Sequence, residues 1–313
     1  MSSSRTIQVN GLEMFLLEQG QGPLVLLCHG WPELSYSWRH QIPALAAAGF
    51  HVVAPDMRGF GRTSAPEDIE AYTILHNVGD MVALVAALGE KQAVIVGHDW
   101  GAPVAWHAAM FRPDIFTKVA GLSVPPFTRG RTRPLDTLRA NGVTNFYWQY
   151  FQPPGIAEAE FERDVAATMR TLLVGRGSPD PAAHQFVEAG KGFLGDGHGN
   201  RPLPGWLTEA DLAYFASIYA KSGFRGGLNW YRNIDRNWEL TAAFQDAQIR
   251  QPSMFLAGSR DGVVTGLIGA RQIAELDKVL PNLKAKIILE GAGHWVQQER
   301  PDEVNAALLE FLK

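Results

Sequence analysis

The 313-residue chain has very little cysteine, no long apolar run and no marked excess of charge of either sign. Its single cysteine, Cys28, excludes an internal disulfide. No apolar run approaches the ~20 residues that a membrane-spanning helix needs, and the first residues, MSSSR, lack the apolar stretch of a secretory signal. The net charge of −4 gives no indication of binding to nucleic acid. We therefore expect a cytoplasmic protein without a membrane span.

Hydrophobic residues make up 46% of the chain, enough for a large core. Apolar runs typical of strands alternate with patterns typical of helices up to about residue 125, and again after residue 244. The expected strands are residues 24–28, 50–54, 93–96, 119–122, 253–257 and 286–289, and the expected helices are residues 42–48, 72–88, 102–110, 268–279 and 303–312. Such alternation predicts an α/β fold with a mostly parallel central sheet and helices on both faces.

The intervening residues 126–244 show helical patterns but no strand pattern, with the clearest helices expected at 157–173 and 209–221. We interpret this segment as a helical cap inserted into the α/β core. It holds more than half of the aromatic residues, some of which we expect to line an apolar pocket. Its segment 195–200, GDGHGN, lacks the ligand spacing of a calcium site and is interpreted as a loop of the cap.

The segment 97–101, GHDWG, follows a short apolar run and precedes a helical pattern. This strand–turn–helix context is that of a nucleophile elbow, although Asp99 stands where such turns usually carry serine. An aspartate, with a reference pKa of about 3.9, is ionised at neutral pH. It can attack carbon directly and form an ester. The sequence therefore predicts Asp99 as a nucleophile.

Two further polar residues, Asp261 and His294, follow expected strands, where α/β sheets place their ligands. The order nucleophile, acid, histidine is that of hydrolase triads. His294 is predicted to take a proton from water while Asp261 fixes its tautomer. His98 adjoins the nucleophile, and adjacent side chains diverge at a sharp turn, so we interpret it as a buried hydrogen-bonding residue. Residues 123–127, another place for the acid, contain no carboxylate.

The segment 29–32, HGWP, follows the expected strand at 24–28. The backbone N–H of Trp31 and that of Trp100, the residue after the nucleophile, are predicted to converge on one oxygen as an oxyanion hole.

With these motifs the chain resembles the epoxide hydrolases of the α/β-hydrolase fold and is similar to the hydrolase domain of soluble epoxide hydrolases. The resemblance spans essentially the whole chain. It rests on HGWPE at 29–33, GHDWG at 97–101, GHW at 293–295 and SGFRGGLNWYRN at 222–233. It implies an α/β-hydrolase core formed by residues 1–125 and 245–313, with residues 126–244 as the cap.

The resemblance also implies two cap tyrosines that hold the epoxide oxygen. Tyr231 matches one of them, and the other falls in FYWQYFQ at 146–152, where Tyr147 is the first assignment and Tyr150 the alternative. A phenol with a pKa of about 10 stays protonated at pH 7 and can donate as the epoxide opens. The predicted substrate pocket is lined by Trp31, Trp100, Tyr150 and Trp295.

The activity that the resemblance implies is conversion of an apolar epoxide and water to a vicinal diol, through an ester on Asp99 that a water activated by His294 and Asp261 hydrolyses. No cofactor, metal or nucleic acid is expected, and the protein is expected as a monomer or homodimer. A haloalkane dehalogenase shares the aspartate elbow and would use N–H donors, such as that of Trp100, to hold a halide. A binding protein that kept the scaffold without turnover is the alternative from another class.

Overall fold

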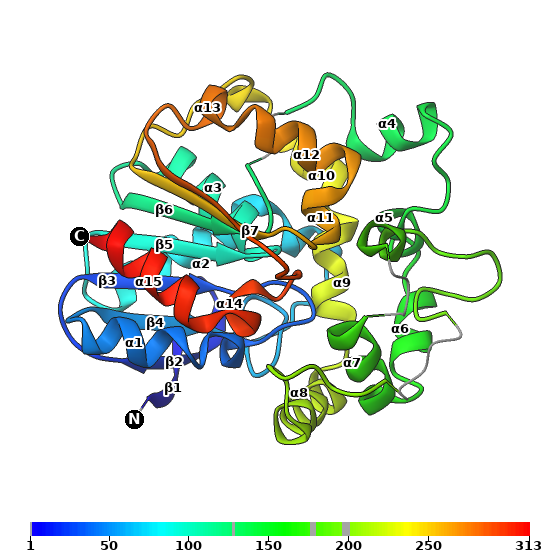
Figure 1. Cartoon of the computed structure of the whole chain (residues 1–313), viewed down its shortest axis with the longest axis horizontal. Helices are drawn as coiled ribbons and strands as arrows, with labels where there is room; N and C mark the ends of the chain where they lie inside the picture. The colour runs from blue at the N-terminus through cyan, green and yellow to red at the C-terminus, as the bar shows by residue number, and fades with distance from the viewer. Residues whose placement is uncertain (1, 127–128, 176–179, 196–200) are drawn as a thin grey trace.

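A computed structural model describes residues 2–126, 129–175, 180–195 and 201–313. Its strands form one eight-stranded sheet in the order β1-β2-β4-β3-β5-β6-β7-β8. The strands are β1 (Ser3–Val9), β2 (Leu12–Gln19), β3 (Leu24–Cys28), β4 (His51–Pro55), β5 (Ala93–His98), β6 (Phe116–Leu122), β7 (Ser253–Gly258) and β8 (Leu283–Leu289). β2 pairs antiparallel with β1 and β4, and the other pairs are parallel. The predicted α/β fold with a mostly parallel sheet is confirmed (Figure 1).

Helices cover both faces of this sheet. They are α1 (Gln41–Ala47) and α15 (Pro301–Leu312) on one face, and α2 (Ile74–Ala87) and α3 (Gly101–Phe111) on the other. Alternate residues of β3 point to opposite faces: Val25 and Leu27 belong to the core beneath α1 and α15, and Leu24 and Leu26 to the core beneath α2 and α3. Because both faces are buried, the strand is apolar throughout.

Between β6 and β7 the described chain forms a series of helices, which gather at one end of the sheet, on the right of Figure 1. They are α4 (Pro134–Ala140), α5 (Tyr147–Tyr150), α6 (Ile156–Phe161), α7 (Val165–Val174), α8 (Glu209–Ser222), α9 (Arg225–Arg232) and α10 (Ile234–Leu240). Strand-like pairing of the described residues there is limited to two isolated bridges. None of the described helices is both long enough and apolar enough to cross a bilayer.

Two expected helices are each broken in two. The segment expected at 157–173 forms α6 and α7, because the side chain of Asp164 accepts a hydrogen bond from Ala167 N and starts a new helix. The segment expected at 268–279 forms α12 (Leu267–Ala274) and α13 (Leu276–Val279), with Glu275 leaving the helical conformation between them. Two single-turn helices, α11 (Gly262–Thr265) and α14 (Val296–Glu299), complete the fold. Residues 196–200 lie outside the described residues, so the loop at 195–200 stays a prediction.

Candidate active site

Asp99 lies in the sharp turn between β5 and α3, with φ at 49°, a left-handed conformation uncommon for residues other than glycine. The turn is tight enough to require glycine on both sides. A Cβ on Gly97 would lie 2.0 Å from the carbonyl oxygen of Gly101, and a Cβ on Gly101 would lie 2.0 Å from that of Cys28. This close approach of three backbone segments explains the two glycines of the motif.

The two carboxylate oxygens of Asp99 have different surroundings. Oδ1 accepts a hydrogen bond of 2.7 Å from the backbone N–H of Trp31, whereas Oδ2 lies 3.5 Å from Nε2 of His294. A Cβ on Gly30 would come within 2.2 Å of Oδ1 and 2.6 Å of the Trp100 nitrogen. Gly30 therefore leaves room for the carboxylate beside the two N–H groups that the sequence predicts as an oxyanion hole.

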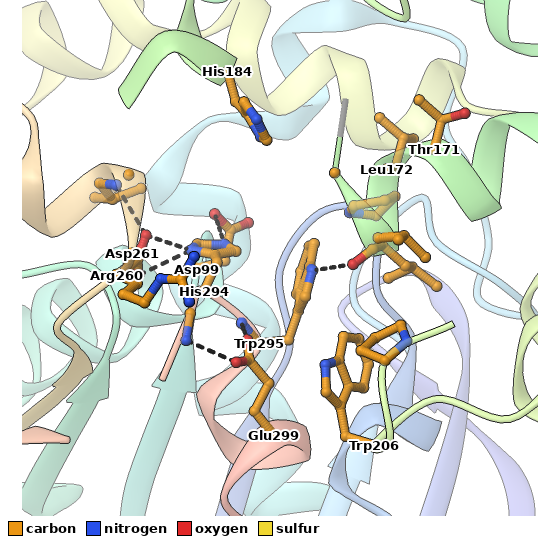
Figure 2. Close-up of a pocket in the computed structure, with 18 of the residues that line it drawn as sticks. Asp99, Thr171, Leu172, His184, Trp206, Arg260, Asp261, His294, Trp295 and Glu299 are labelled. Carbon is orange, nitrogen blue, oxygen red and sulfur yellow. Dashed lines mark hydrogen bonds and ion pairs between the residues drawn. The ribbon is translucent and has the colours of Figure 1, made fainter. Parts of the chain in front are cut away.

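His294 and Asp261 form a close pair on the other side of Asp99 (Figure 2). Nδ1 of His294 lies 3.0 Å from each oxygen of Asp261, which is 1% exposed and also accepts from Val263 N. An ionised carboxylate only accepts, so Nδ1 carries the proton and Nε2 faces Asp99. Burial opposes ionisation of Asp261, but contact with His294 keeps its pKa below the ordinary value. Burial lowers the pKa of His294, but Asp261 and Asp99 raise it well above 6.5 overall.

Glu299, on α14, fixes the loop that carries His294. Its two oxygens accept hydrogen bonds from the backbone nitrogens on either side of the histidine, Gly293 at 2.7 Å and Trp295 at 2.9 Å. Figure 2 shows the carboxylate below His294 and beside Trp295. Sequence reasoning missed this residue. The signal available was a carboxylate at short spacing after the predicted base, which is too common to single out.

The carbonyl oxygen of His294 is held from beneath by His98 and Ser123. His98 Nε2 lies 2.7 Å and Ser123 Oγ 2.8 Å from it. His98 Nδ1 lies 2.5 Å from Oε2 of Glu33, and both side chains are fully buried. The His98 ring thus joins the carboxylate of Glu33 to the carbonyl oxygen of His294. The interpretation of His98 as a buried hydrogen-bonding residue is confirmed. The role of Glu33 was missed.

Replacement of Glu33 should cost stability in a pH-dependent way. Burial raises the pKa of Glu33, but the contact with His98 outweighs it and lowers the pKa from 4.5 to about 2. A group with a lowered folded-state pKa stabilises the protein above the unfolded pKa, and this contribution is lost as the pH falls from 4.5 towards 2. Glu33→Gln is therefore expected to lower the free energy of unfolding at pH 7 by on the order of 3 kcal/mol, and by less at pH 3.5. Urea unfolding at both values checks this, and an equal deficit at both would contradict it.

Two cavities meet at the elbow. The larger has a volume of about 640 Å³ and the smaller about 190 Å³, and both are lined by Asp99, Tyr147, Tyr231 and Val263. The larger also touches Trp31, Trp206, Asp261, His294, Trp295 and Glu299. In Figure 2, Asp99, His294 and Asp261 face Leu172 and Trp206 across this cavity. Trp100 lines the smaller one. The carboxylate of Asp99 thus lies where the two spaces join.

Two tyrosines lie beside this junction, Tyr147 of α5, which is half-buried, and Tyr231 of α9, which is buried. The rings of Tyr147 and Tyr231 are 5.6 Å apart, and that of Tyr231 lies 5.8 Å from Trp31 and 5.1 Å from Trp100. Burial, and then the negative charge of Asp99, raise the pKa of both phenols well above the ordinary value. Both hydroxyls are therefore protonated at neutral pH and available as donors.

Tyr150 lies elsewhere. Its hydroxyl donates a hydrogen bond of 2.7 Å to Glu160, whose carboxylate also accepts from the backbone nitrogens of Phe193 and Leu194. It lines neither of the two cavities that reach Asp99 and instead borders a separate hollow with Glu160. The expectation that Tyr150 lines the substrate pocket is therefore wrong, because the half-buried carboxylate of Glu160 holds its hydroxyl away from the elbow. Of the two alternatives, the structure brings Tyr147 to Asp99.

The cavity walls contain residues that sequence reasoning missed, among them Val263, His107 and Asn237. They come from α11, α3 and α10, and no local motif marks them. Within the described part of the chain, no three His, Cys, Asp or Glu side chains come together as ligands for a metal ion.

Comparison with known proteins gives consistent matches along the whole chain. Residues 23–301 match the family model described as the alpha/beta hydrolase fold. The chain is 46% identical to Epoxide hydrolase A of Mycobacterium tuberculosis, over 99% of this chain and 97% of the relative. The crystal structure of Epoxide Hydrolase A from Mycobacterium thermoresistibile superposes with a TM-score of 0.93 at 47% identity, covering 100% of this chain and 98% of the other. An epoxide hydrolase from an endophytic Streptomyces gives a TM-score of 0.94 at 47% identity, covering 99% and 95%.

Proposed function

The chain belongs to the epoxide hydrolases of the α/β-hydrolase fold, and from this premise we propose that it converts epoxides to vicinal diols through a covalent ester on Asp99. The observation that carries the proposal is the pair of protonated tyrosines, Tyr147 and Tyr231, lining the same two cavities as the carboxylate. An electrophile whose oxygen needs a proton fits between them. Residues 126–244, which supply both tyrosines, act as the cap over the core.

In the first half-reaction, Oδ2 of Asp99 attacks one epoxide carbon while Oδ1 stays hydrogen-bonded to Trp31 N–H. A carbon–oxygen bond forms to Asp99, and the ring carbon–oxygen bond breaks. The leaving oxygen remains tethered to the substrate and takes a proton from Tyr147 or Tyr231. Proton donation matters because an alkoxide is a poor leaving group at neutral pH. The product is a hydroxyalkyl ester of Asp99.

The second half-reaction hydrolyses that ester. Alkylation removes the negative charge of Asp99, which helps to hold the pKa of His294 high, so this pKa falls once the ester has formed and Nε2 is free to accept a proton. Nε2 takes a proton from water, and Asp261 stabilises the imidazolium. The hydroxide attacks the carboxyl carbon of Asp99. The N–H groups of Trp31 and Trp100 stabilise the negative charge that develops on Oδ1. The ester bond breaks, and the departing oxygen takes the proton from His294. The carboxylic acid left at Asp99 returns its proton to the tyrosine, so the diol leaves a regenerated site.

A single turnover in ¹⁸O-labelled water tests this route. With enzyme in excess over styrene oxide, the diol is expected to leave without label, because its second oxygen comes from Asp99. The label is expected in the peptide that contains Asp99, where mass spectrometry locates it. Label in the diol after one turnover would show direct attack of water on the epoxide and would contradict the ester mechanism.

A second assay separates the alternatives that share the aspartate elbow. A halide leaves without taking a proton, so a dehalogenase has no use for two phenol donors beside the nucleophile. We expect diol from styrene oxide and no halide release from 1-chlorobutane. The opposite pattern would favour a haloalkane dehalogenase, and absence of any turnover would favour a binding protein that kept the scaffold.

A further inference from the structure

The smaller cavity is walled mainly by apolar side chains, among them Trp100, Pro103, Val124, Trp148 and Ile234. Set into this wall are His107 and Asn237, each with one polar atom that has no partner among the described residues. Neither side chain belongs to the catalytic scheme above. A polar group that faces an apolar cavity without a partner costs free energy unless something in the cavity bonds to it.

His107 presents a hydrogen-bond acceptor. It lies on α3, roughly 12 Å along the helix from Asp99 at ~1.5 Å per residue. Its Nδ1 is 2.7 Å from the carbonyl oxygen of Pro103, so Nδ1 carries the proton. Burial lowers the pKa of the ring, which is therefore neutral at pH 7 and leaves a lone pair on Nε2. Within the described chain Nε2 is neither bonded nor sealed by protein, so it opens to the cavity that the ring lines. Phe111, edge-on at 5.3 Å, steadies the ring.

Asn237 presents a donor. It lies on α10, and its Oδ1 accepts a hydrogen bond of 2.7 Å from the backbone nitrogen of Ile74 at the start of α2. That bond fixes the orientation of the amide, so Nδ2 is the end left over. No described residue bonds to Nδ2, and this nitrogen, like Nε2 of His107, is not fully buried by protein. Apart from the catalytic tyrosines, Asn237 thus offers the cavity an open donor and His107 an open acceptor.

Two further polar side chains of this wall, those of Arg129 and Thr241, are already engaged. The Arg129 guanidinium lies 3.9 Å over the Trp238 ring and donates to the Trp238 carbonyl and to Gln245. Thr241 Oγ1 donates to the carbonyl of Asn237 at 2.8 Å. Arg129 and Thr241 thus help to shape the wall, whereas His107 and Asn237 each turn an unbonded polar atom to a ligand.

We propose that the smaller cavity is a subsite for the non-reacting arm of an epoxide that ends in a hydroxyl, which donates to His107 Nε2 and accepts from Asn237 Nδ2. The inference rests on the proposed function and specifies its substrate class. At about 190 Å³, the cavity is smaller than the roughly 300–1,000 Å³ of drug-sized pockets. It suits one aromatic ring with a short polar end, and the larger cavity takes the other side of the epoxide.

Two matched pairs of substrates test the subsite. The oxides of 4-(hydroxymethyl)styrene and 4-ethylstyrene have equal size and differ in the hydroxyl. The oxides of 4-acetylstyrene and 4-isopropylstyrene differ in an oxygen that only accepts. The measured quantity is the ratio of kcat/KM within each pair, compared between wild type and variant, so that intrinsic substrate reactivity cancels.

His107→Phe keeps a ring against Phe111 and removes the acceptor. We expect it to lower the hydroxymethyl-to-ethyl ratio about five- to tenfold, the usual effect of one hydrogen bond, and to leave the acetyl-to-isopropyl ratio unchanged. Asn237→Asp keeps the oxygen that binds Ile74 N and replaces the donor by an acceptor. It is expected to lower the acetyl-to-isopropyl ratio by a similar factor.

The possible outcomes distinguish failure of the proposed function from failure of the subsite. If the wild type forms no diol from any of the four epoxides, the proposed function fails. If diols form but neither ratio changes, or if each variant lowers both ratios alike, the subsite is overturned while the function stands. Should one variant fail to fold, the other still decides, because His107 and Asn237 lie on different helices and report on different substrates.

Discussion

His294→Gln is expected to react with one molecule of epoxide and then stop. In the proposed mechanism, alkylation needs the carboxylate of Asp99 and the tyrosine donors, and only the hydrolysis of the ester needs a base. Glutamine cannot take a proton from water, so turnover should fall by roughly 10²–10⁴-fold, the usual contribution of general base catalysis. Mass spectrometry of the intact variant after exposure to styrene oxide should show the full mass of the substrate added to the protein.

Two variants make this result specific. Asp99→Ala should acquire no mass, because it lacks the nucleophile. His51→Gln changes a histidine on β4 that lies near Glu18, away from both cavities, and should turn over normally without an adduct. Proteolysis of the His294→Gln adduct should place the added mass on the peptide that contains Asp99. An unmodified His294→Gln protein, or modification at another residue, would contradict the ester mechanism.

The sequence predicts best those parts of the fold that depend on a single continuous segment. β3 is apolar throughout and β5 is apolar over residues 93–96 because both faces of the sheet are covered, and such short apolar runs are typical of buried strands. The hairpin of β1 and β2 was missed although its turn is visible: Asn10 and Gly11 have φ of 49° and 78°, and Asn-Gly is a strong hairpin signal. At the start of β2, Leu12 and Met14 are buried on either side of the exposed Glu13, an alternation typical of a strand.

What the sequence could not decide depends on contacts between distant segments. Tyr147 and Tyr150 stand three residues apart in one aromatic stretch, and the choice between them is made by Glu160, which takes the hydroxyl of Tyr150. The contacts that hold the carbonyl of His294 also join segments that are distant in the sequence. His98 is 65 residues from Glu33 and 196 from His294, and no spacing rule connects them.

The second large effect is expected at Tyr147 and Tyr231, the two tyrosines that line both cavities. Tyr231→Phe and Tyr147→Phe each remove one donor from the epoxide oxygen and leave the nucleophile, the base and the ring packing in place. Each single variant should slow alkylation, and the double variant should lose most of the roughly 10²–10⁴-fold that proton donation contributes. The measurement is the rate of ester formation under single-turnover conditions, followed by the fluorescence of the nearby tryptophans. Hydrolysis of any ester that forms should be little affected, because His294 and Asp261 are intact.

Tyr150→Phe is the matched control for this prediction, since it makes the same chemical change three residues from Tyr147. Its hydroxyl is bonded to Glu160 outside both cavities, so the alkylation rate should stay near that of the wild type. Equal slowing by Tyr150→Phe and Tyr147→Phe would mean that the effect comes from disturbance of the cap and not from proton donation. A double variant of Tyr147 and Tyr231 that alkylates at the normal rate would instead remove the reason for preferring an epoxide over a halide, because the electrophile would then need no proton to leave.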